Sequence, residues 1–243
     1  MPSPAALRSE ARRAQLAAVT GHVLSADDTG RADHCPRCRG VRVVGYARCY
    51  ACTHLAPSDD GAHLSFAACV VKSSPLYAAF VNYKNFDGEL GEPHRRTMAA
   101  VLSGGYDQHR DKISERLGGP PTIVSVVPST SPTRNWANQP LRRVIDLVGE
   151  LSPRAAQVLE YSGIQRIPGT PQSDLFRPVR VVAGERILLI EDLWVRGTTA
   201  ETARSELLRG GASVGILSIG RELNPSFATA DQLVGALGRP QWW

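Results

Sequence analysis

Apolar runs and amphipathic segments alternate along most of the chain. Short runs rich in β-branched residues predict strands, and apolar positions at a spacing of three or four predict helices. Strands are predicted at Leu64–Val71, Thr122–Val127, Val179–Val182, Arg186–Ile190 and Val214–Ile219, and helices at 4–19, 76–83, 95–102, 106–117, 140–151 and 198–209, with a break at Gly104–Gly105. This alternation predicts an α/β domain with a mostly parallel sheet flanked by helices.

Two polar linkers, at 27–33 and 56–61, divide the chain into regions. The composition, with 42% hydrophobic and 21% charged residues, is globular and excludes a disordered or fibrous chain. We expect an N-terminal helix and linker at 1–30, a cysteine-containing unit at 31–57, the α/β domain at 62–222 and a C-terminal tail at 223–243.

The distribution of charge bears on location and partners. No stretch approaches the roughly 20 apolar residues that span a bilayer, and Arg8, Glu10 and Arg12 stand where a secretion signal needs apolar residues. We therefore expect no membrane span and a cytoplasmic location. The formal net charge is +5, and 25 of the 28 basic residues are Arg. This excess permits an anionic partner such as a phosphate compound or nucleic acid, although a general bias toward Arg on a solvated surface explains it equally well.

Four of the five cysteines fall within 18 positions, as Cys35-Pro-Arg-Cys38 and Cys49-Tyr-Ala-Cys52. Two such pairs can place four thiolates tetrahedrally around one Zn²⁺, with bonds of about 2.3 Å. Two disulfides are the alternative, which the expected cytoplasmic location disfavours. Because four protein ligands close the coordination sphere, the pattern predicts a small zinc ribbon whose metal is structural.

Basic residues around the cysteines allow a second role for this unit. Its arginines are Arg31, Arg37, Arg39, Arg42 and Arg48. They can contact the phosphates of single-stranded DNA, but Tyr46 and Tyr50 are the only aromatic side chains there on which bases could stack. His34 and His54 flank the outer cysteines and are expected beside the metal ligands rather than among them. The fifth cysteine, Cys69, lies in an apolar run and is expected in the core.

The segment from Arg186 to Ala200 indicates a binding site. An apolar strand ends in Glu191 and Asp192, and a short loop containing Gly197 leads to Thr198 and Thr199 at the start of a helix. Ligands bind at the carboxyl ends of parallel strands, and a helix N-terminus attracts phosphate. The two acids can hold a ribose diol, or a Mg²⁺ bound to one. The alternative is that they only satisfy backbone donors at the helix start.

This arrangement resembles the motif with which type I phosphoribosyltransferases bind phosphoribosyl pyrophosphate (PRPP). In that motif two acids and two further residues precede Thr-Thr-Gly-x-Thr. Glu191 and Asp192 match the acids, and Gly197 and Thr199 match Gly-x-Thr. Val195-Arg196 stands where the motif has Thr-Thr, which removes hydroxyl groups and adds a cation.

The order of the regions resembles the ComF family, in which a four-cysteine ribbon precedes a domain of the type I phosphoribosyltransferase class. The segment ending at Lys84 and the turn Val126–Thr130 are similar to segments of that family, and Asn138-Gln139 matches the end of its Arg-Gly-Phe-Asn-Gln box. Arg134 lies one position before the place of the box's Arg. The resemblance covers about residues 34–220.

The resemblance implies a PRPP site that works with Mg²⁺, in a phosphoribosyltransferase-like fold. The ribose diol and the 5′-phosphate would be held by Glu191, Asp192, Gly197, Thr198 and Thr199. The pyrophosphate would lie at the turn after Val127, against Ser129, Thr130, Lys84 and Arg134. Arg196 either pairs with a phosphate or fills the pocket.

Three functions are consistent with this resemblance. The first is transfer of ribose 5-phosphate from PRPP to an amine or nitrogenous base, with release of pyrophosphate. The second is an accessory role in the uptake of single-stranded DNA, and the third is a catalytically silent sensor of PRPP. The sequence identifies neither the acceptor nor an oligomeric state.

Overall fold

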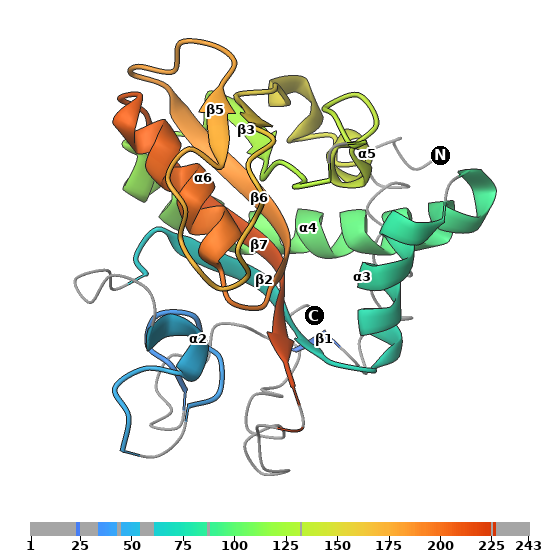
Figure 1. Ribbon diagram of the computed structural model, residues 1–243. Coiled ribbons are helices and arrows are strands. Elements are labelled where there is room, and N and C mark those ends of the chain that lie inside the picture. Colours follow the sequence, from blue (N-terminus) through green and yellow to red (C-terminus); the bar gives the residue numbers. More distant parts are fainter. Residues whose placement is uncertain are drawn as a thin grey trace.

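Four parallel strands form the centre of the protein in the computed structural model, which describes residues 23–24, 34–42, 45–53, 61–86, 88–131, 133–224 and 226 (Figure 1). The strand order is β1-β2-β7-β6-β3, with β1 antiparallel to β2 at one edge. The strands are β1 (Val23–Leu24), β2 (Leu64–Val71), β3 (Ile123–Val126), β6 (Arg186–Trp194) and β7 (Ser213–Leu223). The predicted α/β class, with a parallel sheet flanked by helices, is confirmed.

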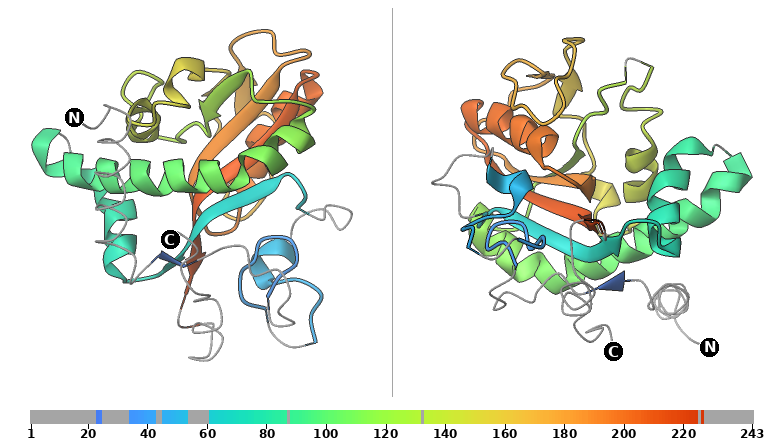
Figure 2. Two further views of the ribbon diagram at one scale, coloured as in Figure 1. Left: turned by 180° about the vertical axis from the view of Figure 1, so that it is seen from behind. Right: turned by 60° about the horizontal axis from the view of Figure 1, so that its bottom comes forward.

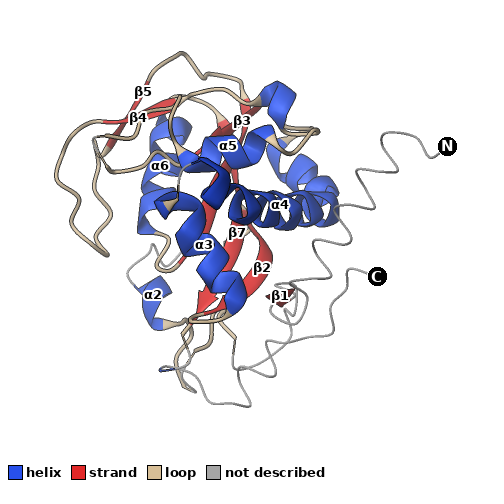
Figure 3. Cartoon of the chain, turned by 90° about the vertical axis from the view of Figure 1, so that its right-hand side faces the viewer, coloured by secondary structure: helices blue, strands red, loops and turns tan. Residues whose placement is uncertain are grey.

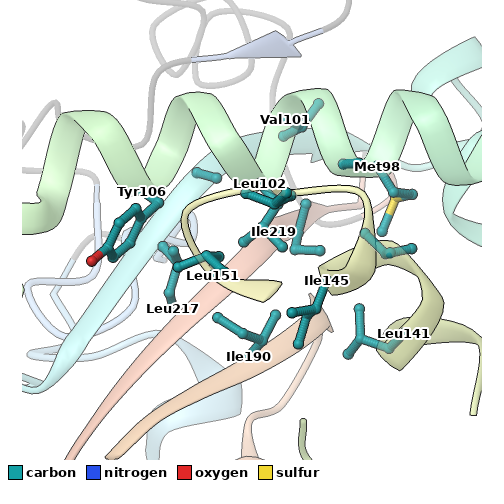
Figure 4. Packing of buried hydrophobic residues seen from close by; sticks show 14 of the residues in the cluster. Met98, Val101, Leu102, Tyr106, Leu141, Ile145, Leu151, Ile190, Leu217 and Ile219 are labelled. Carbon is teal, nitrogen blue, oxygen red and sulfur yellow. The ribbon is translucent and has the colours of Figure 1, made fainter. Parts of the chain in front are cut away.

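Helices cover both faces of this sheet. They are α3 (Pro75–Asn85), α4 (Gly88–Leu117), α5 (Pro140–Asp146), the 3₁₀ turn η1 (Ser152–Arg154) and α6 (Thr198–Arg209), whereas the short helix α2 (Tyr50–Thr53) belongs to the cysteine segment. Ile187 and Leu189 of β6 belong to the cluster that contains the buried side of α6, whereas Leu188 and Ile190 belong to the cluster formed with α3, α4 and α5. Figure 2 shows α4 crossing the face of the sheet opposite α6, and Figure 4 shows α4 and α5 packed against β6 and β7. Burial on both faces explains why the central positions of the parallel strands are mostly apolar.

The pair Gly104–Gly105 does not interrupt α4, so the predicted break is wrong. A Cβ added to Gly105 would lie 2.1 Å from the Cβ of Ala67 on β2. The glycine therefore serves close packing of the helix on the sheet. The sequence shows a glycine pair but not the neighbouring strand, and only that strand distinguishes a close contact from a helix break.

A second small sheet stands apart from the main one (Figure 3). It consists of the antiparallel strands β4 (Leu159–Tyr161) and β5 (Phe176–Pro178). The strand predicted at Val179–Val182 is wrong, because β5 ends before it and no neighbouring strand pairs with this segment in the described chain. Val181 is 84% exposed, while Val182 is buried. An apolar run forms a strand only where a partner edge is available.

Two further elements differ in length from their predictions. Strand β6 continues through Glu191 and Asp192 to Trp194, so both acids lie within the strand rather than after it. Helix α5 ends at Asp146, and the chain continues in tight turns to Leu151. Val148 and Leu151 are nevertheless buried, as their spacing predicts.

Several expectations concern residues that the structure does not describe. The helix predicted at 4–19 and the tail after Ser226 lie outside the described residues, as do Arg31 and His54. Within the described ranges, no helix combines the length and the apolar character needed to cross a membrane.

Candidate functional site

A cavity of about 490 Å³ opens where β3 and β6 end. These strands are adjacent and parallel, with Val126 opposite Ile190, so their carboxyl ends meet at one edge of the sheet. Cavities of this volume are typical of small-molecule sites, and this edge is where open α/β sheets bind ligands. All ten residues expected at the PRPP site line it: Glu191, Asp192, Arg196, Gly197, Thr198, Thr199, Ser129, Thr130, Lys84 and Arg134.

Asp192 is held by groups from a different part of the chain. The Tyr83 hydroxyl donates to Asp192 Oδ2 at 2.5 Å, the Lys84 ammonium forms an ion pair with the same oxygen, and the Leu193 N–H donates to Oδ1 at 2.7 Å. Burial alone would raise the pKa of this carboxyl, but Lys84 and the hydrogen bonds hold the pKa below its ordinary value. The end of α3 is thereby fastened to the end of β6.

The pKa of Glu191, the adjacent acid, is shifted in the opposite direction. Burial and the charge of Asp192 raise its pKa to about 8, against the opposing effect of Lys84 and Arg166. The described residues provide no hydrogen bond that would stabilise its carboxylate. Two adjacent carboxyl groups whose pKa values are driven in opposite directions are characteristic of binding and catalytic sites.

The loop after β6 has the geometry of an anion-binding turn. Gly197 adopts a φ of +77°, and a Cβ at this position would lie 2.0 Å from the Trp194 ring, so both the backbone and the packing require glycine. Helix α6 begins directly after it with Thr198 and Thr199. Within the described chain no side chain caps this helix, which leaves its first N–H groups for a ligand.

The turn after β3 forms the opposite wall of the cavity. Ser129 and Thr130 follow Pro128, and the Gln139 amide donates to the Val127 carbonyl at 2.8 Å, which holds the start of the turn. Arg134 donates to the backbone carbonyl of Lys84 at 3.2 Å. The two cations expected near a pyrophosphate are therefore neighbours.

Eleven of the 21 residues that line the cavity were not among the expected site residues, and three of them bear on its polar groups. Tyr83 contacts Asp192, and Arg166 and Gly169 come from the loop between β4 and β5. A Cβ on Gly169 would lie 2.5 Å from Arg196 Nη1, so Arg196 extends to that loop at the rim. The position of Tyr83 next to Lys84 was a usable signal, whereas nothing in the sequence places the β4–β5 loop over this edge.

A second cavity of about 480 Å³ adjoins the first. The two share Lys84, Arg134 and Pro140 as a common wall. Its other lining residues are Gly88, Thr133, Asn138 and Arg143. Cations and hydrogen-bonding side chains thus surround a space that continues from the site at the strand ends.

The four clustered cysteines form a candidate metal centre. Cys35, Cys38, Cys49 and Cys52 are all buried, and their sulfur atoms lie within 4.8 Å of one another. None of the described cysteines is in a disulfide, and the Sγ atoms of Cys38 and Cys49 are 3.4 Å apart. Tetrahedral zinc–sulfur bonds of about 2.3 Å separate the sulfurs by about 3.8 Å, so the cluster can hold a structural metal such as zinc. Cys69 is buried in the core, as expected.

The chain around the cysteines is tightly turned. Cys35 N–H donates to Gly40 O at 2.7 Å, and His34 and Val41 form an antiparallel bridge. Val43 and Val44, between the two cysteine pairs, lie outside the described residues. The second cysteine pair spans the start of α2.

The arginines near the cysteines do not form a uniform surface. Arg37 is only 3% exposed, and its guanidinium pairs with Glu201 Oε1 at 2.7 Å. Arg42 donates to the carbonyls of Tyr46 and Ala47. The expectation that all five surround the unit as a nucleic-acid surface is wrong for Arg37, because its charge is used to join the unit to α6.

No family model, curated protein or solved structure matches the chain. What the chain binds is therefore inferred from the residues and geometry of the cavity.

Proposed function

We propose that the protein binds PRPP with Mg²⁺ and transfers its ribose 5-phosphate to an amine or nitrogenous base, with release of pyrophosphate. One observation carries this proposal. Three segments far apart in the sequence, ending at Lys84, following Val127 and following Ile190, line one cavity with every side chain expected at a PRPP site. Such convergence at the carboxyl ends of parallel strands supports a ligand with several phosphate groups and a sugar.

The chemistry asks the protein mainly to bind and orient. Glu191 and Asp192 would hold the ribose diol, and the N–H groups and hydroxyls at Thr198 and Thr199 would bind the 5′-phosphate. Displacement at ribose C1 would develop positive charge on the sugar, which the Asp192 carboxylate would stabilise. Glu191, whose pKa is about 8, would contribute a second carboxylate once a bound cation displaces its proton. Their oxygens are the hard ligands that Mg²⁺ prefers, and that ion would offset the charge of the leaving pyrophosphate.

The leaving group would lie on the other side of the cavity. Backbone N–H groups at Ser129 and Thr130 and the cations of Lys84 and Arg134 suit the negative charge of a pyrophosphate. Lys84 pairs with Asp192 in the ligand-free chain, so it would exchange that partner for the ligand. The acceptor would approach C1 from the side of the adjoining cavity, which shares Lys84, Arg134 and Pro140 with the site.

Calorimetric titration with PRPP and Mg²⁺ tests binding, and pyrophosphate release in the presence of amines, ammonia and nitrogenous bases tests transfer. We expect saturable binding by the wild type and about a 30-fold loss of affinity in Asp192→Asn, because charge-assisted contacts of this kind contribute about 2 kcal/mol. Glu150→Gln, which changes an exposed acid remote from the cavity, is the matched control. Absence of PRPP binding by the wild type would refute the proposal.

The departure at Val195-Arg196 favours one alternative, a PRPP sensor without transferase activity. Arg196 lies at the rim and contacts Gly169 of the β4–β5 loop, a position from which it can bind a phosphate without promoting its departure. Binding of PRPP without pyrophosphate release from any acceptor would assign the sensor function.

A further inference from the structure

The metal centre and the phosphate-binding loop are connected by Arg221, a buried residue of β7. It lies opposite Trp194 in the sheet, at the point where β6 leads into the loop. Its guanidinium donates to Trp194 O at 2.9 Å and to Cys38 O at 3.1 Å. One side chain therefore holds both the end of β6 and the first cysteine pair.

The space for this guanidinium is shaped by the cysteine segment. A Cβ on Gly40 would lie 2.2 Å from Arg221 Nη2, so that turn admits the arginine only because Gly40 has no side chain. A buried guanidinium needs acceptors for its N–H groups, and carbonyls of β6 and of the cysteine segment supply them. Displacement of the cysteine segment would remove an acceptor from a buried cation.

A second tie reaches the other end of the same loop. Arg37, between Cys35 and Cys38, pairs with Glu201 in the first turn of α6 at 2.7 Å. His63 Nε2 lies 2.8 Å from the same carboxylate oxygen. Figure 2 (right) shows the blue cysteine segment beside the orange helix α6. Residues 194–201, which comprise the loop after β6 and the first turn of α6, therefore contact the first cysteine pair at both ends. We call this stretch the 194–201 loop.

We propose that Arg221 is a positioning residue, through which the metal-bound state of the four cysteines sets the order of the 194–201 loop and its affinity for a phosphate ligand. Loss of the metal releases the cysteine segment, and with it Cys38 O and Arg37. The loop then stays joined to β6 and α6 through the backbone but loses its contacts with the cysteine segment, through Arg221 at one end and through Arg37 at the other. The effect on affinity rests on the proposed function, whereas the effect on loop order does not.

Hydrogen–deuterium exchange of the full-length protein without ligand tests the structural part. Cys49→Ser is the informative variant, because Cys49 has no described hydrogen bond to β6, β7 or α6, so the change removes a metal ligand and leaves the contacts of Arg221 and Arg37 unaltered. We expect zinc loss and about tenfold faster exchange in peptides covering 194–201, with α4 peptides unchanged. Unchanged exchange at 194–201 after zinc loss would overturn the proposal.

Arg221→Lys and Arg37→Gln test the ties with the four ligands intact, and Arg154→Gln, an exposed arginine of η1, is the control. We expect faster exchange at 194–201 and an about fivefold weaker PRPP affinity in each tie variant, at unchanged zinc content and unchanged far-ultraviolet circular dichroism. Faster exchange at 194–201 in the tie variants, together with no PRPP binding by the wild type, would support the positioning role and refute the proposed function. Full PRPP affinity with a loosened loop would overturn the link to affinity.

Discussion

The cysteine cluster and the strand-end cavity differ in how their polar groups are arranged. All four thiols of the cluster are buried and directed at one another, from a single short segment of the chain. The cavity is lined by groups from several segments, and its Glu191 lacks a hydrogen-bond partner among the described residues. A closed set of donors suits a structural metal, whereas an open set suits a ligand that arrives and leaves.

The two regions also differ in their electrostatics. Arg221 offers a buried cation to the cluster, where burial acts to lower its pKa but the thiolates of Cys38 and Cys49 raise it above the ordinary range. In the cavity, one acid is neutralised by Lys84 and the other has a raised pKa. The cluster thus has an opposite charge beside it within the chain, whereas only one of the two acids in the cavity is paired with a cation.

Removal of the metal should have the largest effect. Cys38→Ser should release zinc and lower the free energy of unfolding by about 4 kcal/mol, because the cysteines share a buried cluster with β2 and α6. We expect the parallel sheet to persist in circular dichroism while the cysteine segment becomes protease-sensitive. A complete two-state loss of structure would instead show that the cluster is integral to the core.

Gly197→Ala should act on the cavity almost as strongly. The new Cβ meets the Trp194 ring and imposes a side chain on a backbone with a φ of +77°. We expect a loss of about 3 kcal/mol in urea denaturation and no measurable PRPP binding. Gly149→Ala is the control, since a Cβ there has no neighbour within 4 Å. Equal effects of the two changes would contradict the special role of Gly197.

The raised pKa of Glu191 predicts a specific dependence on pH. Its pKa rises from 4.5 to about 8 on folding, so the folded protein holds a proton that the unfolded chain has lost between these values. Stability should therefore fall as pH increases through this range, and Glu191→Gln should remove roughly 2 to 3 kcal/mol of the fall between pH 5 and pH 7. Denaturation midpoints at pH 5, 7 and 9 check this, and parallel profiles for both proteins would contradict it.

Replacement of Arg196 should have the smallest effect. This exposed side chain lies at the rim, where an ion pair with a phosphate is screened by water. We expect Arg196→Thr to weaken PRPP binding about threefold. An increase in affinity would show that Arg196 obstructs the cavity, as one interpretation of the sequence allows.

Much of the site could be predicted because its elements are local. The apolar run before Glu191, the glycine at the loop and the threonines at a helix start occupy fifteen consecutive positions, Arg186–Ala200. The cysteine pairs are equally compact. In each case the spacing alone indicates which atoms can meet, because a short segment has few possible conformations.

The unpredicted contacts join residues that are distant in sequence. Nothing near Arg221 indicates that its guanidinium meets Cys38 O, and nothing near Arg37 indicates that it pairs with Glu201. Likewise, Gly105 is explained only by Ala67, which lies on another element. Such contacts depend on the order of strands in the sheet and on which helix covers which face.

The sequence by itself determined the α/β class, the four cysteines as a set, and the identity of the groups at the end of β6, because hydrophobic periodicity and short spacings act over a few residues. Only the tertiary structure decided that Tyr83 and Lys84 reach Asp192, that the β4–β5 loop borders the cavity, and that the cysteine segment contacts both ends of residues 194–201. The physical reason is that a buried charged side chain pairs with the polar group that packing places beside it, and packing depends on the whole chain.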